Sequence, residues 1–240
     1  MSAAVKGGDA RRDRWGDHRA RRRREFVDAA LRVLEAQGPD LPMDAVAAEA
    51  GVTKPVLYRY FQDKSALVDA LAGRGSQILL DRLIPAIRAG CPALSRVRDA
   101  VGAYFAVIDE HPNLYWLLAR EAKAESGGGP GSVQQNKEFI ATALTAVLGD
   151  YLRAYGLDSG GAEPWAYGMT GLVQSTGEWW LQRRSMSRAT VVEYVTQIIW
   201  AAIAGTLRWA GIVVDPDQPF PETRPPLRAV ARADARLAPG

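Results

Sequence analysis

The residues of this sequence that are best suited to chemistry are basic side chains that could neutralise phosphates. Arg21–Arg24 form an unbroken run of four guanidinium groups, and residues 1–24 carry nine basic side chains against three acidic ones. The whole chain is nearly balanced, with a formal net charge of +3. A basic arm on a near-neutral body predicts a localised contact with a polyanion, because general solubility needs no such concentration of charge.

The position of the arginine run supports this interpretation. We expect it in the early turns of a helix over residues 19–37, where the helix macrodipole disfavours cations by about 0.3–1 kcal/mol each. Binding to a phosphate backbone would offset that repulsion through counterion release. Residues 1–18 lack periodic hydrophobicity, so we expect a disordered arm that could follow a minor groove. A solvated charged patch is the alternative.

The sequence provides little for an enzyme or a metal site. Its two histidines are His18 and His111, and its single cysteine, Cys91, can form neither an intramolecular disulfide nor a thiolate cluster. It has no Gly-x-Ser-x-Gly elbow, and the loop around Gly127 lacks the lysine of a phosphate-binding loop. We therefore expect no metal, no cofactor and no enzyme activity, an all-α enzyme acting on an apolar substrate being the alternative.

The elements that must position these residues are helices. Apolar residues recur at helical spacing in nine segments, near 19–37, 42–50, 53–61, 63–89, 94–109, 112–125, 133–155, 163–183 and 188–210. The only strand-like run is Ile212–Val214, which has no partner. No run of eighteen uncharged apolar residues occurs and no apolar segment follows the N-terminal arginines, so we expect a cytoplasmic chain with no membrane span.

These segments predict an all-α fold with a small N-terminal module and a larger C-terminal bundle. The last 26 residues contain six prolines, which favours a loosely held tail. The expected parts are a disordered basic arm (1–18), a helix-turn-helix domain (19–70), a helical bundle (71–212) and a proline-rich tail (213–240).

The segment Met43–Tyr60 has the pattern of a helix-turn-helix. Ala47 is small where the two helix backbones must approach, and Gly51, four residues later, supplies the positive φ that the break requires. The shared core is provided by four apolar residues, Val46, Ala50, Val52 and Leu57. Thr53 is placed to cap the second helix. The exposed first turn of that helix, Lys54–Val56, corresponds to the part of a recognition helix that enters the major groove.

The sequence from Glu25 to Leu71 resembles the DNA-binding domain of the TetR family of one-component transcriptional regulators. The residues that carry the resemblance are Ala48–Phe61, which read AEAGVTKPVLYRYF, and Asp63–Leu67, which read DKSAL. Pro42 departs from the family pattern, which often has a capping hydroxyl at this position. The remaining helices fit the family's nine-helix plan in number and length.

The resemblance implies a role in DNA contact for each matching residue. Lys54 and Arg59 can reach guanine edges or phosphates, and the Val56 methyl groups suit a thymine methyl. Thr53 can hold a phosphate at the helix N-terminus. Core packing is the alternative for Tyr60 and for Phe61. The predicted DNA-binding residues are Thr53, Lys54, Pro55, Val56, Tyr58, Arg59, Tyr60 and Lys64, together with Arg21, Arg22, Arg23 and Arg24; of these, Tyr58, Tyr60 and Lys64 match positions that the family uses mainly on phosphates.

For the bundle, the resemblance implies a homodimer formed by the last two helices and a cavity for a ligand. Small residues at helical spacing support the dimer, with packing inside one subunit as the alternative. The predicted interface consists of Gly168, Gly171, Ser175, Trp179, Val191, Val195, Ile198, Ala202 and Gly205. The predicted pocket residues are Tyr104, Phe105, Ile108, Tyr115, Trp116, Arg120, Phe139, Met169 and Val173, with ordinary core packing as the alternative for the aromatic ones.

These expectations together describe a ligand-responsive regulator that binds a palindromic operator as a homodimer. We expect a repressor that is released from DNA by a small hydrophobic effector, such as a fatty acyl or lipid-like molecule. The alternative is an architectural DNA-binding protein without a ligand. Gly73 and Gly75, in the helix that links the two modules, suggest either a pliable joint or a close contact.

Overall fold

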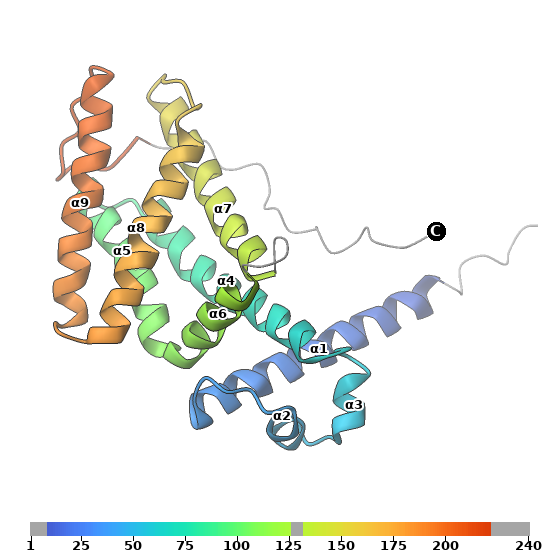
Figure 1. Ribbon diagram of the computed structural model, residues 1–240. Coiled ribbons are helices and arrows are strands. Elements are labelled where there is room, and N and C mark those ends of the chain that lie inside the picture. Colours follow the sequence, from blue (N-terminus) through green and yellow to red (C-terminus); the bar gives the residue numbers. More distant parts are fainter. Residues whose placement is uncertain (1–8, 126–131, 222–240) are drawn as a thin grey trace, which may run out of the picture.

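The computed structural model describes residues 9–125 and 132–221, and within these ranges it contains nine helices and no strand (Figure 1). The helices are α1 (Asp9–Gln37), α2 (Met43–Glu49), α3 (Lys54–Tyr58), α4 (Lys64–Arg88), α5 (Ala93–Glu110), α6 (Pro112–Glu125), α7 (Ser132–Ala154), α8 (Ala162–Arg183) and α9 (Arg188–Trp209). The predicted all-α fold is confirmed. From α2 onward, each helix begins and ends close to its expected residues.

The first helix begins at Asp9 and not at Arg19, so our expectation of a disordered arm is wrong for residues 9–18. Residues 1–8 lie outside the described ranges. The segment lacks apolar periodicity, and its residues of high helix propensity are three arginines and one alanine, set against three aspartates and a glycine. The helix therefore reaches Asp9 by continuity with the amphipathic turns that follow Arg19.

The corner between α2 and α3 has the expected geometry at Gly51, whose φ is +65°. The N–H of Val52 donates to the carbonyl of Ala47 at 2.9 Å across this corner. Thr53 occupies the N-cap position of α3, but the expectation that its hydroxyl caps the helix is wrong, because its side chain makes no capping hydrogen bond. Pro55 has no N–H to offer, and the N–H of Val56 already donates to the Thr53 carbonyl at 2.9 Å.

An N-terminal core holds α1 to α3 on the first half of α4. Its fully buried residues include Phe26, Leu34, Val46, Leu57 and Phe61. Leu114 and Leu117 of α6 belong to the same core, although α6 follows α4 and α5 and lies outside the helix-turn-helix module. The N-terminal module is therefore packed directly against α6, and not only tethered by α4.

The second core lies within the bundle of α4, α5, α8 and α9 (Figure 1). It includes Leu79 and Leu83 from the second half of α4, whereas Leu71, two turns earlier, belongs to the first core. A single helix thus contributes to both cores. The bundle and the N-terminal module are therefore joined through the packing of α4.

Residues 212–221, which we call the C-terminal strap, fold back over the start of α5. The N–H groups of Ala93 and Leu94 donate to the carbonyls of Gln218 at 2.8 Å and Pro216 at 3.1 Å. The first N–H groups of a helix need acceptors from outside it, and Pro92 at the N-cap provides none. The expected loose tail is therefore wrong for residues 213–221, while residues 222–240 lie outside the described ranges.

By length and composition α9 could cross a membrane, contrary to our expectation from the sequence. One of its faces, which includes Val191, Val195 and Ile199, is buried against the rest of the bundle. Its other face carries exposed apolar residues such as Ile198. The high hydropathy thus reflects two apolar faces on one helix of a bundle.

Candidate nucleic-acid interface, ligand cavity and subunit face

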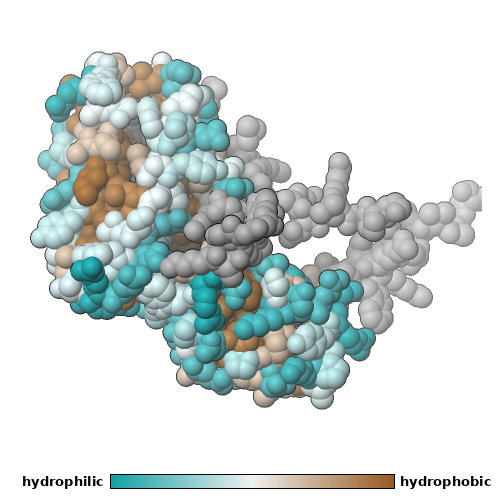
Figure 2. Space-filling view, in the orientation of Figure 1, coloured by the Kyte–Doolittle hydropathy of each residue, from teal (hydrophilic) through white to brown (hydrophobic). Residues whose placement is uncertain are grey.

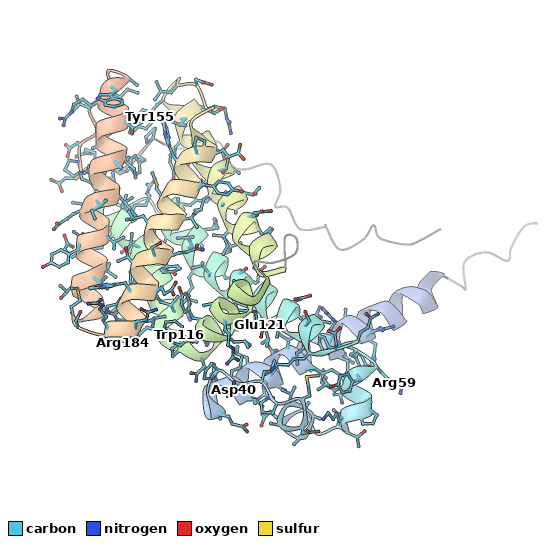
Figure 3. The ribbon with its side chains drawn as sticks, viewed as in Figure 1. Asp40, Arg59, Trp116, Glu121, Tyr155 and Arg184 are labelled. Atoms are coloured by element: carbon cyan, nitrogen blue, oxygen red, sulfur yellow. The ribbon has the colours of Figure 1, made fainter. Side chains whose placement is uncertain are left out.

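The helix α3 lies at the surface of the N-terminal module, away from the bundle (Figure 1). Thr53, Lys54 and Pro55 are exposed at its start, and Tyr58 and Arg59 are exposed at its end. Leu57, on the opposite side, is fully buried and fixes the rotation of the helix. Arg59 and Tyr155 lie at opposite ends of the molecule in Figure 3, so this surface is remote from the far end of the bundle.

Lys54 is paired with Asp44 of α2, a residue that sequence reasoning missed. The Lys54 Nζ and Asp44 Oδ2 atoms are 3.0 Å apart, and this hydrogen bond raises the pKa of Lys54. Both side chains are well exposed, and such surface pairs contribute little to stability. A phosphate or a base edge can therefore replace Asp44 at small cost. The pair could have been inferred from the helix-turn-helix pattern, because the corner at Gly51 brings the first turns of α2 and α3 together.

The arginine run of α1 lies beside the end of α3. The guanidinium of Arg23 is 4.7 Å from the centroid of the Phe61 ring, and that of Arg19 is 5.9 Å from the Tyr60 ring. Arg19 Nη2 also donates to the Arg59 carbonyl at 3.4 Å. Two basic segments about forty residues apart are thus joined into one surface, and Arg19 belongs to it although the sequence did not single it out.

The four arginines of the run differ in their contacts. Arg22 donates to Glu25 Oε2 at 2.7 Å, and this hydrogen bond lowers the pKa of Glu25. Arg21 Nε lies 3.9 Å from the same carboxylate. Arg24 is exposed and has no ion pair among the described residues. Arg23 and Arg24 are therefore the members of the run with most freedom to bind phosphate.

Packing distinguishes the two aromatic residues that follow α3. Phe61 is fully buried in the N-terminal core, which agrees with core packing, the alternative interpretation for this residue. Tyr60 is half-buried and meets the Phe26 ring edge-on, with centroids 5.0 Å apart. Tyr60 can therefore serve both the core and the surface. Lys64, at the first turn of α4, is exposed on the same module.

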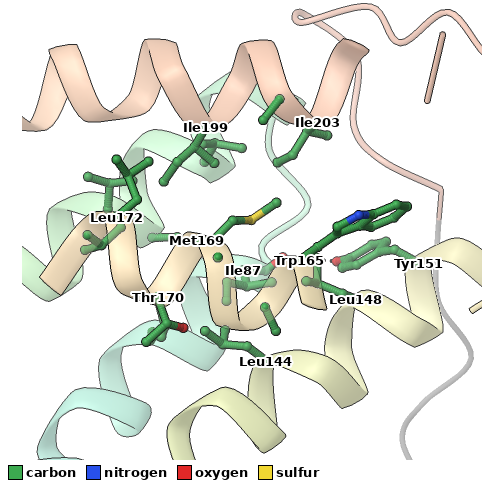
Figure 4. Close-up of a pocket in the computed structure, with 18 of the residues that line it drawn as sticks. Ile87, Leu144, Leu148, Tyr151, Trp165, Met169, Thr170, Leu172, Ile199 and Ile203 are labelled. Carbon is green, nitrogen blue, oxygen red and sulfur yellow. Dashed lines mark hydrogen bonds between the residues drawn. The ribbon is translucent and has the colours of Figure 1, made fainter. Parts of the chain in front are cut away.

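The bundle contains a cavity of about 460 Å³ between α4, α5, α7, α8 and α9 (Figure 4). Three predicted residues line it, namely Tyr104, Met169 and Val173. In Figure 4, Ile87, Leu144, Met169, Leu172 and Ile199 approach one another from four helices. Most of the lining is apolar, which suits a hydrophobic ligand.

The other six predicted pocket residues lie outside the cavity lining. Phe105 and Ile108 are buried in the bundle core, where Phe105 meets the Trp180 ring at 5.7 Å. Arg120 pairs with Asp40 at 3.0 Å, on the surface between α6 and the N-terminal module. Phe139 is exposed on α7, and Tyr115 and Trp116 are half-buried on α6. The rotation of α5 explains the first two, because its face through Val97, Val101 and Tyr104 is the one that lines the cavity.

Sequence reasoning missed the polar groups of the cavity. Arg96, Tyr151 and Thr170 line it, and burial raises the pKa of the lining Tyr104 hydroxyl strongly. Within the described residues, Arg96 Nε, Tyr104 Oη and Thr170 Oγ1 are buried and have no hydrogen-bond partner. A signal for Arg96 was available, since it falls on the apolar stripe of α5 that also contains Val97 and Val101.

The outer faces of α8 and α9 form an apolar patch (Figure 2). Ile198, Ala202 and Gly205 of α9 are exposed, as are Gly168, Gly171 and Ser175 of α8, while Trp179 is half-buried. A Cβ added at Gly168, Gly171 or Gly205 would meet no atom within 4 Å. Val191 and Val195 were wrongly assigned to this face: each is 2% exposed and packs inside the subunit. These two valines lie on the side of α9 that packs against α5. We call the exposed residues Gly168, Gly171, Ser175, Ile198, Ala202 and Gly205 the α8–α9 face.

Comparison with known proteins gives two family matches that together span most of the chain. The model described as "Bacterial regulatory proteins, tetR family" matches residues 26–71, and "Tetracyclin repressor-like, C-terminal domain" matches residues 82–211. An uncharacterised HTH-type transcriptional regulator of Mycobacterium tuberculosis is 34% identical over 85% of this chain and 86% of its own length. The "HTH-type transcriptional activator FasR" of Mycolicibacterium smegmatis is 28% identical over 82% of this chain and 89% of its own length.

Solved structures show the same fold. A TetR-family regulator from Streptomyces coelicolor has a TM-score of 0.64 at 24% identity and covers 79% of this chain and 83% of its own. The regulator FadR of Bacillus subtilis, solved in complex with stearoyl-CoA, has a TM-score of 0.58 at 15% identity. It covers 73% of this chain and 96% of its own.

Proposed function

Since the chain belongs to the TetR family of transcriptional regulators, we propose that it binds a palindromic operator as a homodimer and leaves it when an effector fills the bundle cavity. The observation that carries this proposal is the exposed α3, which has a cation at each end and whose C-terminal end lies beside the arginines of α1. One surface thus combines groups for base edges with groups for phosphates. Such a regulator acts on chromosomal DNA, so we place it in the cytoplasm.

The chemistry of DNA contact follows from the exposed groups. Lys54 and Arg59 supply cations at the two ends of α3, and the exposed hydroxyls of Thr53 and Tyr58 suit phosphate oxygens. Pro55 and the half-buried Val56 present apolar surface for a thymine methyl. Arg23 and Arg24 would hold the flanking backbone and, through counterion release, make the affinity fall steeply with salt.

The effector would act through contacts that join the bundle to the N-terminal module. His111 Nδ1 lies 3.0 Å from Glu35 Oε1, and Asn113 Nδ2 donates to the Leu34 carbonyl at 2.8 Å. Arg120 also donates to the carbonyl of Pro39 at 3.0 Å. His111 directly precedes α6, and Asn113 and Arg120 lie within it. A change in the shape of the cavity would therefore reach α1 through α6 and α4. Ligand and operator then oppose each other by reciprocal coupling.

We propose that the protein represses transcription. It would block transcription while it occupies the operator, and effector binding would release it and end the block. FasR of Mycolicibacterium smegmatis is named an activator, so in vitro transcription with and without the protein is the direct check of sign. A purely architectural DNA-binding role would not use a cavity of this size. The apolar lining favours a hydrophobic effector, and the stearoyl-CoA bound to the Bacillus subtilis FadR contains a long apolar chain.

Substitution of Lys54 and Tyr58 tests the assigned DNA surface. Operators would be selected from a randomised duplex library with the wild-type protein, and Kd would be measured at fixed salt. Lys54→Ala should weaken binding by about 1–3 kcal/mol, or roughly 5- to 150-fold, because a contact to a base edge or phosphate is lost. Tyr58→Ala should weaken binding uniformly across operator sequences.

Arg153→Ala is the matched control, since Arg153 is an exposed arginine on α7 that pairs only locally with Asp150. It should bind DNA as the wild type does. Sedimentation should show that all three variants keep the wild-type oligomeric state. Unchanged operator affinity in both Lys54→Ala and Tyr58→Ala would refute the assigned surface.

A further inference from the structure

We propose that Arg96 anchors a compact anion at one end of the cavity, so that the effector is a single-chain amphiphile with a terminal carboxylate or phosphate. This inference rests on the proposed effector role of the cavity and names the chemical class of the effector. It starts from a charge that the protein leaves buried at the cavity wall.

Arg96 is 5% exposed and has no carboxylate within ion-pair distance among the described residues. Its Nη1 donates to Tyr151 Oη at 2.8 Å, and that hydroxyl donates to the Ile87 carbonyl at 3.0 Å. Its Nε is buried and has no hydrogen-bond partner in the part of the chain that the structure describes. A buried guanidinium with an unused donor is unfavourable unless an anion completes it, and a planar fork of N–H groups suits carboxylate or phosphate.

Aromatic rings hold this guanidinium in place. Its carbon atom lies 5.7 Å from the centroid of Tyr151 and 5.3 Å from that of Phe220. Phe220 belongs to the C-terminal strap, whose carbonyls accept hydrogen bonds from the start of α5, three residues before Arg96. Cation–π contacts orient the arginine without neutralising it, so its charge remains available to a ligand.

The rest of the cavity is suited to an alkyl chain. Besides Arg96, the lining includes Leu83, Val97, Leu144 and Ile199. If a methylene group occupies about the volume of one liquid water, near 30 Å³, the cavity holds on the order of 15 such groups. That room suits a head group with a medium-length chain inside. Thr170 Oγ1 and Tyr104 Oη, which also have no hydrogen-bond partner among the residues that the structure describes, could meet a polar substituent on the alkyl chain.

The test compares three ligands of equal chain length: dodecanoate, dodecyl phosphate and dodecan-1-ol. Binding to the full-length wild-type protein would be measured by calorimetry, with quenching of the lining Trp165 as a second signal. We expect at least one anion to bind at least tenfold more tightly than the alcohol. The tighter of the two anions then identifies the head group as carboxylate or phosphate.

Variants of Arg96 assign the preference to this side chain. Arg96→Met, which keeps much of the volume, should abolish the advantage of the anion and leave alcohol binding within about twofold. Arg96→Lys keeps the charge without the fork and should fall between. Arg153→Met, the same substitution at an exposed arginine of α7 that is not part of the cavity lining, is the control and should keep the preference for the anion.

The outcomes separate this inference from the proposed function. Equal binding of the anions and the alcohol to the wild type, or an anion preference that survives in Arg96→Met, would overturn the Arg96 anchor and leave a hydrophobic effector in place. Because the wild-type comparison needs no variant, it decides the question even where Arg96→Met fails to fold. If none of the three ligands binds, the anchor and the effector role of the cavity both fail, while the DNA-binding proposal stands on its own test.

Discussion

At the scale of single residues, Gly177 of α8 packs closely against the side chain of Tyr104, which lines the cavity. A Cβ at this position would lie 2.8 Å from Tyr104 Cε1 and 2.9 Å from Ile108 Cδ1. Gly177→Ala should therefore displace Tyr104 and destabilise the protein by about 1–3 kcal/mol, in spite of the higher helix propensity of alanine. Urea unfolding at a fixed protein concentration measures the change.

Gly102→Ala on α5 is the matched substitution, because a Cβ there would meet nothing within 4 Å. It should raise the free energy of unfolding by up to about 1 kcal/mol through helix propensity alone. Equal effects of the two substitutions would contradict the close contact between Gly177 and Tyr104.

Single residues also show where sequence reasoning succeeds and where it stops. The helix-turn-helix positions could be predicted because their constraints are local: Gly51 must turn the chain, and Leu57 must be buried four residues before Phe61. The cavity lining depends on how far each bundle helix is rotated, which long-range packing decides. Tyr104 therefore lies in the cavity lining, whereas its neighbour Phe105 does not.

At the scale of elements, α4 and α6 are joined where Gly75 meets Leu114. A Cβ at Gly75 would lie 3.2 Å from Leu114 Cδ2, so this glycine allows close approach of the two helices, whereas Gly73 is exposed on the same helix. Gly73→Ala should stabilise the protein by up to about 1 kcal/mol. Gly75→Ala should be less stable than Gly73→Ala, because Leu114 must move to accommodate the methyl group.

The same pair of substitutions tests whether this helix contact transmits the effector signal. Moving Leu114, which packs in the N-terminal core, should alter the effector concentration that releases DNA in Gly75→Ala. Gly73→Ala should leave that concentration unchanged, unless α4 acts as a pliable joint at Gly73. Unfolding curves and effector titrations of the operator complex separate the two interpretations, and identical behaviour of both variants would exclude a role for the Gly75–Leu114 contact.

Element boundaries were predictable wherever a breaker or a cap fixes them. Asp63 caps α4 by accepting a hydrogen bond from the Ala66 N–H at 2.8 Å, as its position indicated. The start of α1 was not predictable from periodicity, because residues 9–18 form a helix without an apolar stripe. The order of residues 213–221 was hidden as well, since it depends on acceptors that α5 needs from a distant part of the chain.

At the scale of the whole molecule, the two cores are not independent units. Leu71 and Leu79 place one helix in both, and Leu117 brings α6 from the bundle side into the N-terminal core. A regulator needs such shared elements, because an effector can shift DNA affinity only through a structural change that both sites experience. The boundary expected at residue 70 therefore separates the proposed DNA-binding function from the proposed effector-binding function, but the N-terminal core extends across it.

The α8–α9 face carries the last prediction, that two subunits associate through it. Ile198 of this face is 54% exposed, its neighbours Ala201 and Ala202 along α9 are also exposed, and an exposed apolar patch of this kind marks an interaction site. Ile198→Glu would bury a charge in the interface, so sedimentation velocity should show a shift from dimer to monomer.

Operator affinity should fall with the dimer, because a lone subunit contacts one half-site and loses the contribution of the second. Phe139→Glu is the control, since Phe139 is an exposed aromatic residue on α7 outside this face. It should leave both the sedimentation coefficient and operator affinity unchanged. A dimer that persists in Ile198→Glu would move the interface elsewhere and leave the apolar outer side of α9 without a role, whereas dissociation with intact half-site binding would show that the two recognition helices depend on this face for their spacing.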